Sequence, residues 1–323
     1  MKTTSFVPAL ALAACAGAAW AADASRYPER PVRMIVPNAP GSSVDTLTRI
    51  VGNKLSEVLG QQVVMDNRPG AGGVIGMELA KNANPDGYTM IAATTAASTI
   101  AVQLLKKPTY DPVKDYDYVV QFAATPNVLI VNPSLPVKSV KELIEYCKSK
   151  NGQVNMASAG TGSQSHLSGT YLLQAGHFTA LHVPYKGGGA SVASVIAGES
   201  QFSITPAAAV MGHVRGGRLR AIGHSLPHRT PLLPGIPPIA ETIPGFDYSG
   251  WQGFFLPKGT PKAINDKLRA AVIKTVNLPD VQAALHAQAT EIVTGTPEQF
   301  KKLVQESYVK NTAVLKAVGL LKK

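Results

Sequence analysis

Short apolar runs alternate with amphipathic stretches along most of the chain. The run from Val32 to Val36 is rich in β-branched residues and stops at Pro37, and a Gly- and Ser-rich loop then leads into apolar positions spaced three or four residues apart from Leu47 to Val58. The first pattern is typical of a buried strand and the second of an amphipathic helix. Gly60 follows, a residue suited to the left-handed conformation that ends many helices. We therefore predict a strand, a loop and a helix in this order.

The same unit recurs further along the chain. We predict additional strands over residues 62–65, 88–93, 127–131, 154–157, 181–183, 202–204, 219–222 and 253–256. Helix-compatible stretches follow most of them, and one begins with Ser139 and Glu142, the spacing of a capping box. Repeated strand–helix units favour parallel, doubly wound sheets. Residues 225–250 break the pattern, because they are dense in Pro and Gly and have little periodicity.

We interpret that interval as a return path between two α/β lobes, with chain crossings near residues 123–127 and 246–251. The first lobe would comprise residues 22–125 plus 247–323, with the C-terminal helices packed on it. The second would comprise residues 126–246. Ligands of such folds bind in the crevice at the carboxyl ends of the strands, so we expect the site in a cleft between the lobes.

The first 21 residues have the features of a secretory signal peptide. Lys2 precedes an apolar run over residues 6–17, and Ala19-Trp20-Ala21 is a small-x-small cleavage site. The segment ending at Cys15 also resembles a lipoprotein cleavage site, so a lipid anchor at Cys15 is the alternative. Either route places the mature chain outside the cytoplasmic membrane. Past this leader no apolar run approaches the roughly 20 residues that a membrane span needs, so we expect a periplasmic protein.

Composition narrows the function classes. The 323-residue chain is 45% hydrophobic and 16% charged, enough to bury a sizeable core, and its net charge is +11. Its Lys and Arg residues are scattered and not interleaved with aromatics, which argues against nucleic-acid binding. The charge either helps to collect anions or only keeps the protein soluble. Cys147 is the only cysteine after the leader, so the mature chain, which we expect to be monomeric, forms no internal disulfide.

Two loops carry most of the candidate chemistry, each between a predicted strand and helix. Residues 158–166 place at least six polar donors within nine residues, and residues 39–45 place small residues before a helix start. Unpaired N–H groups at a helix start bind anions, and hydroxyl groups add donors, so a carboxylate could be held without arginine. The alternative is that Ser43 or Asp45 only caps the first helix, and Ser163 and Ser165 the second. A third loop, Tyr185 to Gly189, exposes backbone N–H groups or is a plain flexible turn.

Enzyme and cofactor motifs are missing. The glycines at residues 70–76 have G-x-G-x-x-x-G spacing without the acidic residue of a dinucleotide site, and no nucleophile elbow, zinc-protease motif or phosphate loop occurs. The seven histidines lack ligand-like spacing, so we predict no metal and no cofactor. Ser163 and His166 could form a nucleophile and base, but no third group is evident to orient the imidazole. A periplasmic hydrolase stays a minor alternative.

Many separate segments closely resemble the Bug receptors of tripartite tricarboxylate transporters. They are IVPNAPGSSVD, DNRPGAGG, NPDGYTM, VLIVNPSLPVKSVKEL, ASAGTGSQSHL, HVPYKGGGA, GRLRAIG and the W-x-G-x-x-x-P string from Trp251 to Pro257. The resemblance covers nearly all of the mature chain, in the family's order. It implies a two-lobed Venus-flytrap fold with mixed, mostly parallel sheets, capture of small carboxylates for a two-component membrane permease, and no catalysis. A sensor subunit that presents its ligand to a membrane kinase is an alternative role.

The resemblance also implies which residues bind the ligand. They are Ser42, Ser43, Asp45, Thr94, Thr95, Ser158, Thr161, Gly162, Ser163, Gln164, His166, Tyr185 and Thr205. Two departures bear on ligand identity. Asn38 and Ser42 stand where the family usually has Phe and Gly, and Ile204-Thr205 occupies a strand end that is often acidic. Without an acidic partner for an ammonium group, a dicarboxylate or an aromatic acid is favoured over an amino acid.

Overall fold

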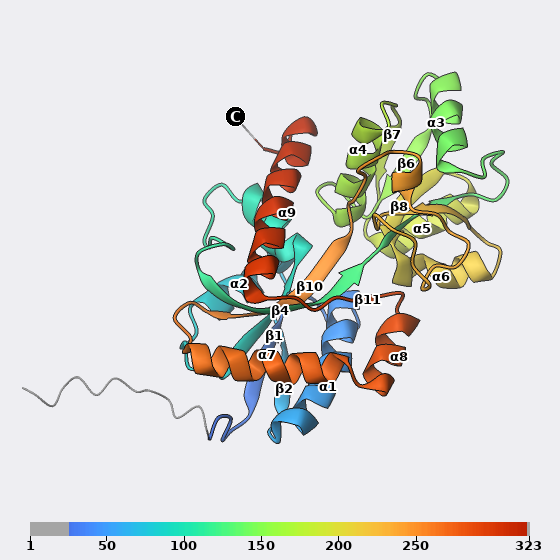
Figure 1. The fold of residues 1–323 in the computed structure, drawn as a ribbon. Helices are drawn as coiled ribbons and strands as arrows, with labels where there is room; N and C mark the ends of the chain where they lie inside the picture. The colour runs from blue at the N-terminus through green and yellow to red at the C-terminus, as the bar shows by residue number, and fades with distance from the viewer. Residues whose placement is uncertain (1–25, 322–323) are drawn as a thin grey trace, which may run out of the picture.

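Two mixed sheets, each flanked by helices, form the two lobes of the protein (Figure 1). The computed structural model describes residues 26–321, so the expected signal peptide and Cys15 lie outside the described residues. The first sheet has the strand order β11-β4-β10-β3-β1-β2 and the second the order β7-β6-β8-β5-β9. The first sheet contains β1 (Val32–Val36), β2 (Val63–Asn67), β3 (Thr89–Thr94), β4 (Tyr116–Thr125), β10 (Gly250–Pro257) and β11 (Glu291–Ile292). The second contains β5 (Asn127–Val131), β6 (Asn155–Ser158), β7 (Leu181–Pro184), β8 (Phe202–Pro206) and β9 (Arg220–His224).

The helices alternate with these strands. Those beside the first sheet are α1 (Ser43–Leu59), α2 (Val74–Lys81), α7 (Lys262–Val276), α8 (Pro279–Ala287) and α9 (Pro297–Ala317), with the short helical segments η1 (Ala71–Gly73), η2 (Ala96–Ile100) and η3 (Ala101–Leu104). Those beside the second are α3 (Val140–Ser149), α4 (Gln164–Ala175), α5 (Gly188–Ala197), α6 (Ala207–Arg215) and η4 (Ile239–Glu241). The first predicted unit is confirmed, since β1 has the predicted bounds and Gly60 ends α1 with a φ of 67°.

The sheets are mixed, but parallel pairs do not predominate as expected. Over residues 26–321, four strand pairs are parallel and five antiparallel. The antiparallel pairs all involve β4, β5 or β10, the strands next to the two chain crossings, because a strand that enters or leaves a lobe runs against its neighbours there. The sequence patterns also missed β4 altogether, although it is ten residues long.

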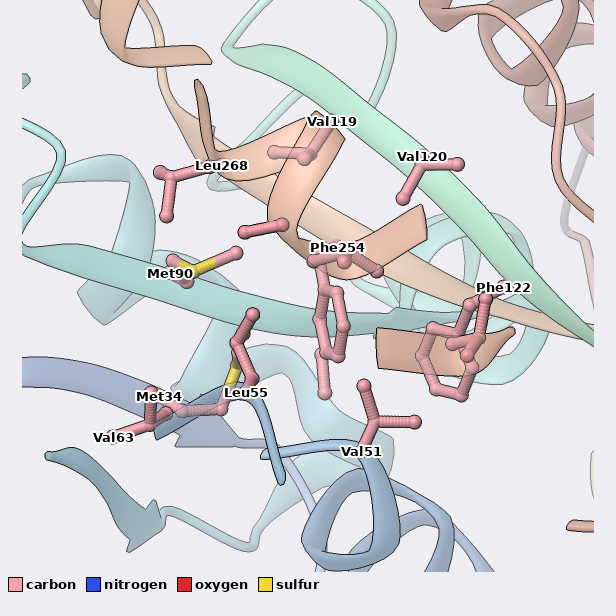
Figure 2. Packing of buried hydrophobic residues seen from close by; sticks show 14 of the residues in the cluster. Met34, Val51, Leu55, Val63, Met90, Val119, Val120, Phe122, Phe254 and Leu268 are labelled. Atoms are coloured by element: carbon pink, nitrogen blue, oxygen red, sulfur yellow. The ribbon is translucent and has the colours of Figure 1, made fainter. Parts of the chain in front are cut away.

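Apolar side chains fill both faces of the first sheet. Figure 2 shows the face covered by α1 and α7, where Leu55 and Leu268 pack toward Met34 and Phe254 of the sheet. Each of these side chains is fully buried. At about 25 cal/mol per Å² of apolar area, such burial is the main term that stabilises the lobe.

The last helix, α9, does more than cover the other face of the first sheet. Phe300 packs there against Trp251 and Phe255. Val314 and Leu315, about four turns further on, belong to the apolar cluster of the second lobe. The end of α9 therefore also contacts the second lobe, in addition to the expected packing of the C-terminal helices on the first.

The two chain crossings are tied to one another by Asn127, which is buried. Its side-chain amide donates to the backbone oxygen of Tyr248 (2.8 Å) and to Ser168 Oγ (3.1 Å). Its backbone N–H donates to Ser225 Oγ, which contacts Ser249 Oγ at 2.8 Å. The outgoing segment, the end of β9 and the returning segment thus form one hydrogen-bonded hinge.

The strand register decides which loops face the hinge region. In the first sheet, the end of β4 (Thr125) pairs with the start of β10, and the ends of β3 and β1 lie at the same edge. In the second sheet, the start of β5 pairs with the end of β8 (Pro206), and β6 runs parallel to β8. The loops after β1, β3, β6 and β7 therefore lie on the two edges that face each other across the hinge. No helix within residues 26–321 is long and apolar enough to span a membrane.

Candidate functional site

The loop before α1 is held by Asp45. This carboxylate is 2% exposed and accepts from the Gly41 N–H (2.8 Å), from Arg49 Nε (2.9 Å) and from Asn67 Nδ2 (2.8 Å). Burial alone would raise its pKa, but the bonds from Arg49, Asn67 and Gly41 outweigh burial and hold the pKa below its ordinary value. An ionised carboxylate has no proton to donate, and the Asp45 oxygens already accept hydrogen bonds from three donors, so Asp45 cannot bind a ligand carboxylate directly. Asp45 thus shapes the loop, and the free donors lie beside it.

Those donors are at the start of α1. Ser42 Oγ accepts from the Asp45 N–H, so Ser42 is the N-cap, while the Ser43 hydroxyl is exposed. The backbone N–H groups of Ser43 and Val44 are the first of the helix and have no acceptor among the described residues. Unpaired N–H groups at a helix start are able to bind an anion.

The loop from Ser158 to His166 begins α4 in a similar way. Ser163 is the N-cap and accepts from the His166 N–H at 3.2 Å, and Ser165 Oγ accepts from the Ala159 N–H at 2.9 Å. Gly160 and Gly162 have φ values of 124° and 78°, which glycine adopts without strain. Capping therefore occurs at both helix starts. It leaves the Gln164 and Ser165 N–H groups without acceptors in the described part of the chain.

The Gln164 side chain is the most unusual group of this loop. Its Nε2 and Oε1 atoms are both buried, and neither has a hydrogen-bond partner within residues 26–321. A buried amide without partners costs about 1–3 kcal/mol for each unsatisfied group, so it marks a place where a further polar partner is expected.

Two stacked histidine rings contact the loop from Ser158 to His166. The rings of His166 and His182 are stacked, with centroids 3.8 Å apart and an interplanar angle of 13°. His166 Nδ1 accepts from the Gly162 N–H at 3.0 Å, and His182 Nε2 lies 2.6 Å from Ser158 Oγ. Burial and, second, the neighbouring His182 lower the pKa of His166 to about 4, and burial lowers the pKa of His182, so both rings are neutral at neutral pH. Sequence analysis missed His182, because its partners His166 and Ser158 lie 16 and 24 residues away along the chain.

Ser163 and His166 do not form a nucleophile–base pair in this arrangement. Ser163 Oγ contacts the backbone N–H of His166 and Ser165 Oγ, and the imidazole contacts Gly162 and His182 instead. Over the described residues there is also no group of three or more His, Cys, Asp or Glu side chains placed to hold a metal ion.

The remaining candidates are distributed around the hinge edges. The hydroxyl oxygen of Thr94 accepts from the Ala97 N–H, and that of Thr95 from the Trp251 N–H, so each keeps one proton to donate. Tyr185 directs its hydroxyl to Ser200 Oγ at 3.2 Å. Thr205 is buried on β8, and Thr161 is exposed at the tip of its loop.

The two lobes approach each other closely at Gly162. A Cβ added to Gly162 would lie 3.3 Å from Leu104 Cδ1 of η3 and 3.9 Å from Leu320 Cδ1. The second-lobe loop thus lies close to the first lobe and to the C-terminal segment after α9, without room for a side chain at Gly162 that leaves Leu104 undisturbed.

A separate cavity of about 210 Å³ lies beside the hinge. It was not expected from the sequence. Thr95 borders it, with residues of β10, α9 and the segment after β9, among them Trp251, Lys310 and Leu226. Of the predicted site residues, only Thr95 lines this cavity.

Two lobes, two crossing segments and polar loops on facing edges define a two-lobed solute-binding protein. A family model described as the tripartite tricarboxylate transporter family receptor (TctC) matches residues 47–320. The chain belongs to this family.

Individual relatives agree with this assignment over nearly their whole length. BugT of Bordetella pertussis is 34% identical over 309 residues, which are 95% of this chain and 94% of BugT. The solved structure of R. palustris Rpa4515 with adipate is 29% identical with a TM-score of 0.79, covering 91% of this chain and 98% of Rpa4515. MatC from Rhodopseudomonas palustris with bound malate is 30% identical with a TM-score of 0.75, covering 90% and 100%. The chain is therefore a Bug-type receptor, from a family of solute-binding proteins and not of enzymes.

Proposed function

We propose that this receptor binds a small carboxylate, a dicarboxylate or an aromatic acid, in the periplasm and delivers it to the membrane permease of a tripartite tricarboxylate transporter. Two relatives were solved with the dicarboxylates adipate and malate. In this chain the loop from Ser158 to His166 carries the proposal, because it combines free helix-start N–H groups with the unpartnered Gln164 amide.

The loops before α1 and α4 would bind the ligand from opposite sides. The N–H groups at the start of α1 would hold one end of the ligand, and those at the start of α4, with Gln164 and His166, would hold the other. Hydrogen bonds to a charged acceptor contribute about 1.5–3 kcal/mol each. Micromolar affinity corresponds to about 8 kcal/mol, so a few such bonds suffice after the cost of closure.

Hinge closure would couple binding to delivery. Residues 22–125 plus 247–323 would move as one lobe and residues 126–246 as the other, about the crossings joined by Asn127. A ligand that makes more bonds in the closed form shifts the population toward it, and the permease would recognise that form.

A thermal-shift screen of malate, adipate, longer dicarboxylates and benzoate tests the ligand class. Binding to the native state raises the melting temperature, and the stabilisation grows with the logarithm of the ligand concentration relative to Kd. We expect a dicarboxylate or benzoate to stabilise the protein, and isothermal titration to give the affinity. If no carboxylate shifts the melting temperature, the proposal is wrong.

Gln164→Leu tests the loop itself. Because the amide has no partner without ligand, its removal should leave the free protein at least as stable. The affinity for the stabilising acid should fall about tenfold, since one or two bonds to the ligand are lost. Gln174→Leu, at an exposed position near the other end of α4, is the control and should leave the affinity unchanged.

A further inference from the structure

His182 lies outside the predicted binding loops, yet it contacts the Ser158–His166 loop at both ends. Its Nε2 is 2.6 Å from the hydroxyl of Ser158, where the loop leaves β6. Its ring stacks on His166, where the loop enters α4. Since β7 is paired in register with β6, with His182 opposite Met156, the position of this ring is set by the sheet and not by the loop.

The hydrogen bonds of His166 define its tautomer. Nδ1 accepts from the Gly162 N–H and is therefore unprotonated, so a neutral ring carries its proton on Nε2. Nε2 has no partner among the described residues, and it is not one of the buried unpartnered atoms, so it reaches accessible space. His166 is thus a neutral donor at the start of α4.

No other charge competes for this pair of rings. Of the ionisable groups in residues 26–321, only His182 acts on the pKa of His166 through its charge. On the neighbouring elements, Tyr171 of α4 packs against Phe246 and Tyr248, and Tyr185 after β7 is bonded to Ser200. Lys186 is exposed. The orientation of His166 therefore depends on two contacts, the Gly162 N–H and the His182 ring.

We propose that His182 is a positioning residue for ligand binding: it holds Ser158 and supports the His166 ring, so that His166 presents its Nε2–H to a carboxylate oxygen of the ligand. This inference rests on the proposed function. It also predicts a specificity of the site. Because the Nε2–H group is fixed as a donor, the ligand must place a hydrogen-bond acceptor at that point. Gly160, whose N–H donates to Ser158 Oγ at 3.2 Å, keeps the same end of the loop in place.

The tautomer can be measured without any ligand. Histidine ¹⁵N spectra of the free, full-length mature protein should show His166 as the Nε2–H form, with its signals assigned by comparison with His166→Gln. In His182→Ala we expect a mixture of both tautomers, because the stacking platform is lost. His182→Phe keeps an aromatic platform and should retain the Nε2–H form, which also guards against a general folding defect. Retention of the pure Nε2–H form in His182→Ala overturns the proposal.

Titration with adipate and malate then tests the consequence for binding. We expect His182→Ala to weaken the better of the two acids about tenfold, as for the loss of one bond to a charged acceptor. His182→Phe should weaken it less, about threefold, because only the Ser158 contact is lost. His286→Ala, at an exposed position on α8, should bind as the wild type does. Wild-type affinity in His182→Ala would refute the role of His182. If the wild type binds no carboxylate, the proposed function fails, while the spectra still decide what His182 does.

Discussion

Single residues in this protein are often held by partners far away in the sequence. The Asp45 carboxylate is bonded by Arg49 one turn along α1 and by Asn67, 22 residues later at the end of β2. Arg49 also donates to Asn67 Oδ1 at 2.8 Å. These bonds form a closed network that ties the start of α1 to the end of β2.

Replacing Asp45 by Asn should destabilise the protein by about 1–3 kcal/mol, because a buried, bonded charge is lost and Arg49 keeps no anionic partner. Chemical denaturation at pH 7 measures this. The folded-state pKa of Asp45 is depressed, so its contribution is present above the unfolded pKa of about 3.9 and is lost as the pH falls through the folded value. The difference between variant and wild type should therefore shrink below about pH 4. Asp266→Asn, which breaks an exposed pair with Lys262, should change stability by less than about 0.5 kcal/mol.

His224 gives a pH dependence of the same sign at higher pH. It is fully buried at the end of β9, neither ring nitrogen has a partner in the described structure, and burial, followed by the charge of His228, lowers its pKa to about 4. The unfolded chain binds a proton near pH 6.5 and the folded chain only near pH 4, so stability should fall as the pH falls from about 6.5 to 4.

His224→Leu should reduce this slope, by up to about 1.4 kcal/mol per pH unit, and should raise stability at pH 5. Thermal or denaturant unfolding between pH 4 and 8 measures both effects. His286→Leu, an exposed helix position, should keep the wild-type slope. An unchanged slope in His224→Leu would show that this ring is not kept neutral by the fold.

At the scale of elements, the same local device begins several helices. Ser42, Ser139 and Ser163 are the N-caps of α1, α3 and α4, and each accepts from the N–H three residues later. Local sequence predicts such caps well. The three helix starts differ in their place in the fold. α1 and α4 begin at the edges of the two sheets that face each other across the hinge, whereas α3 begins after the end of β5 that lies away from the hinge.

Ser163→Ala and Ser139→Ala should therefore differ in one respect only. Each removes a cap and should cost about 1 kcal/mol of stability. Ser163→Ala should also weaken carboxylate binding, by about fivefold or more, because it loosens the loop that presents Gln164 and His166. Unfolding and calorimetric titration of both variants measure this. Equal affinities would show that Ser163 only caps its helix.

For the whole molecule, the hinge connects the binding loops to any movement of the lobes. Asn127 bonds the outgoing crossing to the returning one, and α9 continues from the first lobe into the apolar cluster of the second. These contacts must persist or rearrange when the lobes close. Scattering of the free and ligand-saturated protein should show a smaller radius of gyration with ligand.

Asn127→Ala should destabilise the protein by about 1–3 kcal/mol, because the bonds to Tyr248 and Ser168 are lost in a buried place. It should also change the ligand affinity, since closure would no longer be guided by the same contacts. Asn132→Ala is a matched control, as its amide donates to the Val195 and Ile196 carbonyls at the far end of β5. It should lose similar stability and bind ligand normally. If both variants bind the ligand like the wild type, the Asn127 contacts do not influence ligand binding, and the hinge role of Asn127 is wrong.

The sequence by itself determined the features that depend on neighbouring residues. β1 and β5 have their predicted bounds, Ser163 caps α4, and Gly60 ends α1, because burial period, capping and left-handed turns are local properties. The cap of α1 is Ser42, however, and not Ser43 or Asp45. The ordered motifs also identified the receptor family, which the family model confirms over residues 47–320.

Tertiary structure decided the rest, because it depends on which segments meet. β4, with charged residues beside its apolar core, becomes a strand only between β10 and β11. The antiparallel pairs follow from the chain crossings, and Asp45 is tied to the end of β2 because the fold brings Asn67 next to it. The stacking of His166 on His182 arises from the register of β7 on β6, which no spacing along the chain reveals.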